Sequence, residues 1–188
     1  MHTLRLAMPE DLPELRRLIG ESVRQLSQGH YTHTQIESAL RFVFGVDTQL
    51  IADGTYYVIE AHDGLAASGG WSRRQTLYGG DQFKHAEDPV LNPARDPARI
   101  RAFFVHPNWA RRGLARALFE RCLGAAHAEG FKQLELAATV PGEPLYIALG
   151  FRVVERYAAP MPDGTELPLA RMIRPIGSPT PTSSDSLR

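Results

Sequence analysis

The chain has 188 residues, of which 43% are hydrophobic and 22% charged, a balance typical of one folded domain with a single sizeable core. Lysine plus arginine equals aspartate plus glutamate, at 21 each, so the net charge does not indicate a nucleic-acid partner or a charged membrane surface. The single cysteine, Cys122, excludes an internal disulfide and is expected in the core, and no apolar window approaches the roughly 20 residues that a membrane-spanning helix needs. A cytoplasmic protein is therefore expected.

The N-terminal part of the chain predicts one strand and two helices. A strand at about residues 3–7 leads into a helix over 12–23, where leucine, isoleucine and valine recur at helical spacing. The second helix is expected to begin with a capping box formed by Thr34 and Glu37 and to end before Gly45.

A hairpin and a long connection are expected next. Apolar runs at 56–60 and 65–71 flank Asp63-Gly64, a pair that favours a tight turn between two strands. Residues 75–97 lack periodicity and contain two adjacent glycines and several prolines. Connections of that length are commonly functional.

The second half of the chain alternates strands and helices, as in an α/β sheet. The elements expected there are a strand at 99–105, a helix at about 111–129, a strand at 131–138, a short helix between Pro144 and Gly150, and strands at 151–158 and 167–174. The last residues, 177–188, are rich in serine, proline and threonine and are expected to be a disordered tail after a folded domain at 1–176.

The first strand and first helix of this half are joined by a segment with the features of an anion-binding turn. Backbone N–H groups at a helix start lack intrahelical partners, and the helix dipole is positive there. Gly113 and Ala115 leave room for a phosphate to approach these amides. Arg111, Arg112 and Arg116 add positive charge around it. Neither a Gly-x-Gly-x-x-Gly pattern nor a Gly-Lys-Ser/Thr pattern is present, so a Rossmann or P-loop site is not indicated.

This turn resembles the coenzyme-binding motif of the GNAT N-acetyltransferase superfamily, which reads Gln/Arg-x-x-Gly-x-Gly/Ala after a strand, with Ala110 at its first position here. Residues 145–151, Leu-Tyr-Ile-Ala-Leu-Gly-Phe, are similar to the family's Leu-Tyr-x-x-x-Gly-Phe signature. The opening strand, followed by residues 9–12, is similar to the start of such enzymes. The resemblance implies an α/β GNAT fold with a mixed central sheet of about six to seven strands, splayed fourth and fifth strands, and about four flanking helices.

The resemblance also implies acetyl-CoA as the cosubstrate. No metal is expected, because His30 and His33 are expected on a loop and the acidic cluster at 81–88 is expected to be solvated. The pantetheine arm of the coenzyme would lie in the gap between the splayed strands and pair with the backbone of Phe103, Phe104 and Val105. The residues that would hold the pyrophosphate are Arg111, Arg112, Gly113, Leu114, Ala115 and Arg116. Thr139 stands where many relatives have an asparagine that contacts the coenzyme.

For catalysis, the resemblance implies that Tyr146 protonates the departing thiolate and that a backbone N–H near Val105 stabilises the oxyanion. Arg99 stands where some relatives carry a glutamate, so no general base is assigned. The residues considered for that role are Glu60, Asp81, His85, Asp88 and His106.

The implied function is direct transfer of an acetyl group to a primary amine of a small molecule or peptide. The residues expected near the acceptor are Tyr31, His33, Trp71, Arg73, Arg74 and Tyr78. If Arg73 and Arg74 face the cleft, an acceptor with a carboxylate or phosphate is favoured.

Other functions stay open at this stage. Because Ala110 and Thr139 depart from the motif, the alternative is a non-catalytic acyl-CoA-binding sensor or interaction module. A nucleic-acid-binding regulator would predict strongly salt-dependent affinity, against which the zero net charge argues. Neither a nucleic acid nor a membrane is expected as a partner, whereas pairing of exposed strand edges into a homodimer is left open.

Overall fold

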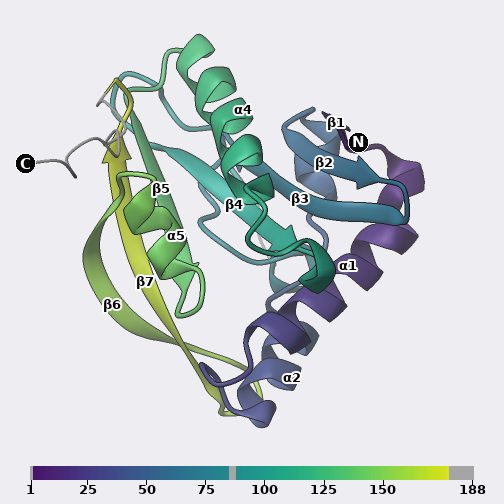
Figure 1. Cartoon of the computed structure of the whole chain (residues 1–188). Helices are drawn as coiled ribbons and strands as arrows, with labels where there is room; N and C mark the ends of the chain where they lie inside the picture. The colour runs from purple at the N-terminus through teal and green to yellow at the C-terminus, as the bar shows by residue number, and fades with distance from the viewer. Residues whose placement is uncertain (1, 85–87, 178–188) are drawn as a thin grey trace, which may run out of the picture.

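A mixed sheet of seven strands runs through the molecule in the order β1-β2-β3-β4-β5-β7-β6 (Figure 1). The computed structural model describes residues 2–84 and 88–177, so the predicted tail lies outside the described residues apart from Gly177. Only β4 and β5 are parallel among the neighbouring strands described. The strands are β1 (Thr3–Leu6), β2 (Tyr56–Ala61), β3 (Gly64–Ser72), β4 (Ala98–Val105), β5 (Gln133–Thr139), β6 (Arg152–Pro160) and β7 (Glu166–Pro175).

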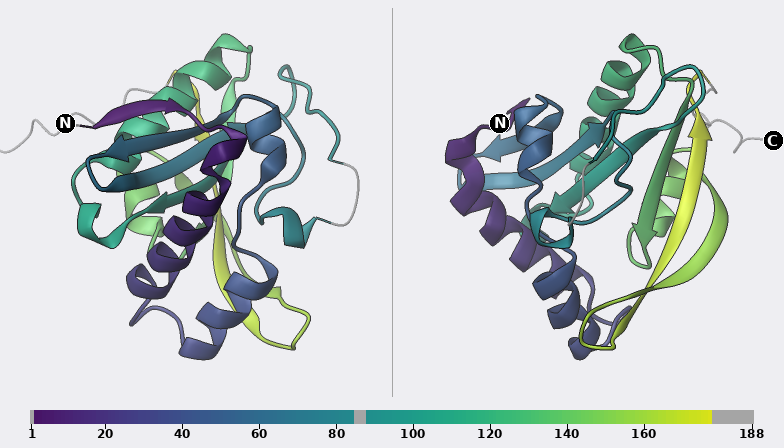
Figure 2. Two further views of the ribbon diagram at one scale, coloured as in Figure 1. Left: turned by 90° about the vertical axis from the view of Figure 1, so that its right-hand side faces the viewer. Right: turned by 180° about the vertical axis from the view of Figure 1, so that it is seen from behind.

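Five α-helices occur in the described residues, where the sequence predicted about four, and they cover both faces of the sheet (Figures 1 and 2). The helices are α1 (Leu12–Leu26), α2 (His33–Phe42), α3 (Thr48–Ala52), α4 (Leu114–Ala128) and α5 (Glu143–Ala148). Three short 3-10 turns lie at η1 (Pro9–Asp11), η2 (Asp81–Phe83) and η3 (Pro107–Trp109). The unexpected helix is α3, because five residues are too few for a periodic pattern to emerge.

Two helix starts differ from the sequence prediction. The capping box of α2 is formed by Thr32 and Gln35, where Thr32 Oγ1 accepts the Gln35 N–H at 3.2 Å and Gln35 Oε1 accepts the Thr32 N–H at 2.9 Å. The prediction of Thr34 as the cap was therefore wrong. Helix α4 begins three residues later than expected, because Arg111 and Gly113 adopt left-handed conformations with φ of 59° and 81° that interrupt a helix.

The gap expected between the fourth and fifth strands is confirmed. β4 and β5 are paired only at their starts, at Ala98 with Leu134 and Arg99 with Glu135. β5 pairs with β7 along its whole length, and beyond the two pairs with β4 the parallel strands separate, as Figure 1 shows. An ion pair between Arg99 and Glu135 joins the strands where the gap begins. The backbone of β4 beyond this point is therefore open to a ligand on one side.

The apolar side chains form one core on each face of the sheet. The core beneath α4 and α5 contains Trp71, Phe131 and Cys122, and burial raises the pKa of the Cys122 thiol far above its ordinary value, as expected for a packing residue rather than a nucleophile. The core beneath α1 and α2 also holds the turn between β6 and β7. Among the described residues no helix is both long enough and apolar enough to cross a bilayer.

Candidate active site

A cavity of about 890 Å³ lies where β4 and β5 separate, and residues from both faces of the sheet line it. It collects Tyr146 and the residues predicted to bind the coenzyme, with one exception among them, Arg112. Those that line it are Phe103, Phe104, Val105, Arg111, Gly113, Leu114, Ala115, Arg116, Thr139 and Tyr146.

The turn before α4 presents a run of free backbone donors. The six N–H groups of residues 111–116 donate to no acceptor in the described part of the chain, and the first bond of the helix runs from the Ala117 N–H to the Gly113 carbonyl at 3.0 Å. The alternation of left-handed residues at Arg111 and Gly113 gives the turn a concave form, which is the geometry of an anion-binding nest. The turn therefore has the free donors and the backbone geometry of an anion site.

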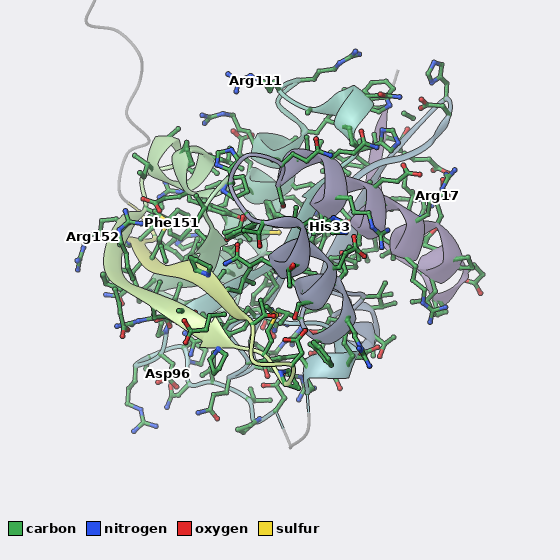
Figure 3. The ribbon with its side chains drawn as sticks, turned by 90° about the horizontal axis from the view of Figure 1, so that it is seen from below. Arg17, His33, Asp96, Arg111, Phe151 and Arg152 are labelled. Carbon is green, nitrogen blue, oxygen red and sulfur yellow. The ribbon has the colours of Figure 1, made fainter. Side chains whose placement is uncertain are left out.

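Two arginines at this turn leave their charge available. The side chains of Arg111 and Arg116 are exposed and form no ion pair with a described residue (Figure 3 labels Arg111, which points outward). Arg112 behaves differently, because its guanidinium lies 4.9 Å from the ring centre of Trp109. The Trp109 indole N–H in turn donates to Asp63 at 3.2 Å. Arg112 therefore stacks on Trp109 at the start of the turn and does not line the cavity.

A β-bulge changes the direction of the strand in the part of β4 that borders the gap. Ala102, with a φ of 55°, and Phe103 together lie opposite Gly69 in β3. The Phe103 ring covers Gly69, where an added Cβ would come within 2.5 Å of a ring carbon. Phe103 packs on the core beneath α4 and α5, whereas Phe104 packs on the opposite core. Both side chains thus pack internally while their backbone lies at the gap.

The Val105 N–H points toward α1 rather than toward β3. It donates to Ser22 Oγ at 3.3 Å, whereas the next amide, that of His106, donates to Ala66 in β3 at 2.8 Å. Ser22 is a buried residue of α1 and also lines the cavity. A polar atom bound to the cavity could therefore accept the Val105 N–H in place of Ser22.

Tyr146 reaches the cavity from α5 and is 9% exposed. Its ring centre lies 6.3 Å from that of Phe103 and 5.8 Å from that of Phe151. Burial raises the pKa of the Tyr146 phenol well above its usual range, so the group keeps its proton at neutral pH. Thr139 Oγ1 nearby accepts the Gly142 N–H at 3.2 Å. Tyr146 is therefore both a packing residue and an available proton donor.

None of the described residues considered as a general base lines the cavity. His106 has both ring nitrogens in use, because Nδ1 accepts the Asn108 N–H at 3.2 Å and Nε2 lies 2.8 Å from a carboxylate oxygen of Glu21. The carboxylates of Glu60, Asp81 and Asp88 are bonded to Arg5, the Thr48 N–H and the Thr76 N–H. His85 lies outside the described residues.

His30, which the sequence did not indicate as a general base, lines the cavity just beyond the end of α1. Nothing in its neighbouring sequence marks it, because it comes close to the gap only through the fold. Tyr31 next to it accepts the Val140 N–H at 2.8 Å and donates to the Pro168 carbonyl at 2.7 Å, which ties this segment to the ends of β5 and β7.

Of the residues expected near the acceptor, only Tyr78 lines the cavity among those described. Trp71 is buried in the core, and Arg74 binds Asp53 through two contacts of 2.7 and 2.9 Å. Arg73 lies 3.3 Å from a carboxylate oxygen of Glu129. Neither Arg73 nor Arg74 lines the cavity, so the condition under which they would select an anionic acceptor is not met.

Comparison with known proteins agrees with this geometry. The sequence model described as the acetyltransferase (GNAT) domain matches residues 90–159, which run from before β4 into β6. A search of curated proteins found no match. In the described part of the chain, no group of three or more metal-ligating side chains is arranged to hold an ion.

Solved structures share the fold over nearly the whole chain. The GCN5-related N-acetyltransferase from Rhodopseudomonas palustris has a TM-score of 0.68 at 18% identity, covering 92% of this chain and 94% of that one. The putative acetyltransferase yncA from Salmonella typhimurium, solved with acetyl-CoA, has a TM-score of 0.60 at 16% identity, covering 98% and 99%. A phosphinothricin acetyltransferase from Sinorhizobium meliloti, solved with AcCoA, has a TM-score of 0.60 at 25% identity, covering 97% and 92%. The domain match covers the segment from before β4 into β6, and the solved acetyltransferases share the fold of nearly the whole chain.

Proposed function

We propose that the protein is an N-acetyltransferase that moves an acetyl group from acetyl-CoA directly to a primary amine. The observation that carries the proposal is the nest at 111–116, whose six amides donate to no acceptor among the described residues and which adjoins the gap between β4 and β5. Two GNAT relatives of the same fold were solved with the acetylated coenzyme, which supports the same cosubstrate here.

The shape and charge of the cavity suit this coenzyme. A pyrophosphate carries negative charge and many acceptor oxygens, which match the free amides of 111–116 and the unpaired Arg111 and Arg116. An extended pantetheine arm can lie in the gap and pair with the open backbone of residues 103–105. Its thioester end then comes close to the Val105 N–H and Tyr146, which line the same cavity.

The reaction forms a C–N bond between the amine and the acetyl carbonyl carbon and breaks the C–S bond of the thioester. We assign the Val105 N–H to the carbonyl oxygen, whose negative charge grows during attack, with Ser22 Oγ beside it. Tyr146 gives its proton to the departing sulfur, because burial keeps its phenol neutral. The amine loses one proton as the new bond forms, and the Tyr146 phenolate regains a proton from solvent before the next turnover.

We assign removal of the amine proton to His30. An imidazole can accept a proton near neutral pH, and His30 lines the cavity on the side of α1. Its exposed position gives the proton a route to solvent. A general base on the chain is thus available without the strand glutamate that some relatives carry.

The proposal is tested in two steps with purified protein. Titration calorimetry with acetyl-CoA measures binding, and thiol release with primary amines, followed by mass spectrometry of the acetylated product, measures transfer. Binding with amine-dependent release supports the enzyme. Binding without release from any amine favours the acyl-CoA sensor instead, and absence of binding contradicts both. The cytoplasmic location remains a prediction that fractionation of cells would test.

A further inference from the structure

The two faces of the sheet line the cavity in different ways. On the face of α4 and α5 a backbone nest and two exposed arginines lie among apolar side chains such as Leu114 and Leu145, whereas on the face of α1 apolar side chains lie beside one arginine that is buried. The residues on this second side are Ser22, Val23, Leu26, Ser27, His30, Val43, Phe44, Gly45, Leu77, Tyr78, Gly79, Gly80, Arg101, Ala102 and Phe104. We call this set the acceptor wall.

Aromatic and aliphatic groups dominate the acceptor wall. The rings of Phe44 and Phe104 meet edge to face, with centres 6.2 Å apart and planes at 75°. Leu26 is 37% exposed, so it offers an apolar surface that is not used up in the core. Tyr78 packs its ring on Phe83, with centres 4.9 Å apart. Such a wall favours a ligand with a large apolar part, because the transfer of apolar surface out of water is favourable.

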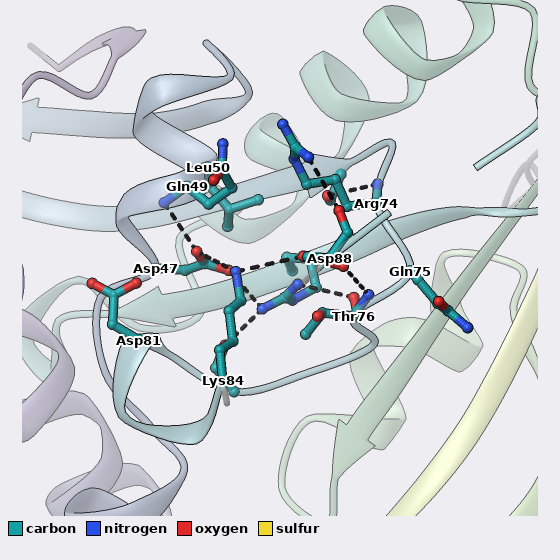
Figure 4. Close-up of polar contacts among 12 residues, drawn as sticks. Asp47, Gln49, Leu50, Arg74, Gln75, Thr76, Asp81, Lys84 and Asp88 are labelled. Carbon is teal, nitrogen blue, oxygen red and sulfur yellow. Dashed lines mark hydrogen bonds and ion pairs between the residues drawn. The ribbon is translucent and has the colours of Figure 1, made fainter. Parts of the chain in front are cut away.

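The one arginine of the acceptor wall is already satisfied. Arg101 is 2% exposed, and its guanidinium bonds Asp47 at 2.8 Å, the Thr76 carbonyl at 2.9 Å and the Gly79 carbonyl at 2.6 Å. Lys84 joins the same network through Asp47 at 2.6 Å (Figure 4). The Arg101 guanidinium therefore holds the loop that carries Leu77 and Tyr78 in place, and it does not select an anionic ligand.

Hydrogen bonds close one end of the acceptor side. Tyr31 bonds both Val140 and Pro168, and Gln35 Nε2 donates to the Glu166 carbonyl at 2.9 Å. These bonds join the α1–α2 segment to β5 and to the hairpin of β6 and β7, whose turn lies beside α2 in Figure 1. His30 and Thr139, the chain neighbours of two bonded residues, line the cavity at this end. A small molecule can therefore be accommodated at this end without parting these bonds, which a polypeptide passing between the segments would have to break.

We propose that the acceptor is a small primary monoamine with an apolar or aromatic body. This inference rests on the proposed function and names its substrate class. The amine would meet the gap near Val105 and His30, while the body would lie on Leu26, Phe44 and Phe104. A second ammonium group, or a carboxylate, on that body would lie against apolar side chains and lose its water without gaining a partner.

The test uses pairs of amines that differ by one charge. Rates of thiol release are compared for hexylamine against 1,6-diaminohexane, and for 2-phenylethylamine against phenylalanine, with a short peptide as a further acceptor. The expected kcat/KM is higher for the singly charged member of each pair by about tenfold or more. Equal or faster release with the diamine, with phenylalanine or with the peptide overturns the inference and leaves the proposed acetyltransferase standing.

Failure of the proposed function would be recognised separately. If no amine gives release, calorimetric titration of hexylamine and of 1,6-diaminohexane into protein saturated with coenzyme A decides the inference. Preferential binding of hexylamine supports the apolar wall even in a protein without transferase activity. Equal binding, or binding of neither amine, overturns it.

A gain of function gives a second, independent readout. Leu26→Glu adds the missing countercharge to the acceptor wall and should raise the diaminohexane-to-hexylamine ratio of kcat/KM by about tenfold. Val90→Glu makes the same change at a residue that is 63% exposed and does not line the cavity, so its ratio should match that of the wild type. An unchanged ratio in a folded Leu26→Glu protein, verified by its melting curve, contradicts the placement of the acceptor on this wall.

Discussion

The two sides of the cavity differ in the groups that they offer to a ligand, backbone amides on one side and side chains on the other. The side under α4 and α5 takes its binding groups from one continuous turn, residues 111–116, and most of those groups are backbone amides. The acceptor wall takes side chains from α1, from the segment after α2, from the loop before β4 and from β4 itself. One side therefore depends on local conformation, and the other depends on the tertiary fold.

This difference allows one half of the site to be general and the other specific. A backbone nest needs only residues that tolerate left-handed conformations, so the amino acids around it can change without loss of the phosphate site. A wall of side chains changes its chemistry whenever one residue changes. The following variants separate the two sides, from the largest expected effect to the smallest.

Gly113→Val should damage the nest most. Gly113 has a φ of 81°, which valine adopts only with strain, and its side chain would stand over the amides that a phosphate must reach. Loss of two hydrogen bonds to a charged group, about 2 kcal/mol each, predicts that the Kd for acetyl-CoA rises by about 1000-fold. Titration calorimetry measures it.

Gly164→Val is the matched control for that variant. Gly164 has a φ of 82° and, like Gly113, has no atom within 4 Å of an added Cβ, but it lies in the turn between β6 and β7. It should lower stability by a similar amount without changing coenzyme affinity. If both variants weaken binding equally, backbone strain rather than the nest explains the effect.

Arg101→Met should disrupt the packing of the acceptor wall and leave the nest at 111–116 unchanged. The substitution leaves Asp47, which is fully buried, with Lys84 as its remaining ion-pair partner and releases the carbonyls of Thr76 and Gly79. Loss of one member of a buried ion pair predicts about 3 kcal/mol less free energy of unfolding. Urea denaturation measures it, and the KM for the amine should rise while the Kd for acetyl-CoA stays the same.

A surface pair provides the contrast for Arg101. Arg24 binds Glu37 at 2.8 Å on the outside of α1 and α2, and both side chains are exposed. Arg24→Met should leave the urea midpoint nearly unchanged, since an exposed pair is screened by solvent. Equal losses in the two variants would mean that the Arg101 network does not owe its strength to burial.

Tyr146→Phe should lower kcat by about 100-fold and leave the Kd for acetyl-CoA unchanged, because the ring still packs on Phe103 and Phe151 while the proton donor is lost. Since burial raises the pKa of this phenol, the wild-type rate should not fall through its ionisation between about pH 7 and 9. Steady-state kinetics over this range measure both. Tyr57→Phe, a buried residue that does not line the cavity, is the control, and equal losses in both would remove Tyr146 from the chemistry.

Much of the fold and of the nest could be predicted from the sequence, because their signals are local. Asp63-Gly64 predicted the hairpin, and Gly113 predicted a turn that admits an anion. The start of α4 was placed too early, since helical periodicity continues into the turn and gives no sign of the left-handed Arg111. The gap between β4 and β5 followed from resemblance alone.

The acceptor wall could not be predicted in the same way. Phe44, Leu77 and His30 come together only after three separate segments pack against β4, and no spacing along the chain marks that meeting. Arg73 and Arg74 were expected there because of their charge, but Asp53 and Glu129, distant in sequence, pair with them. The ion-pair partners of a charged side chain are decided by the tertiary fold, so the charge of a residue alone predicts a ligand contact poorly.

His30→Ala is the smallest change and the sharpest test of what the acceptor side adds to the chemistry. If the imidazole accepts the amine proton, the variant should lose about tenfold in kcat near neutral pH, with the Kd for acetyl-CoA unchanged. His33→Ala removes a histidine of α2 that does not line the cavity and should keep the wild-type kcat. An unaltered kcat in His30→Ala would assign proton removal to water and leave the acceptor wall with a role in binding alone.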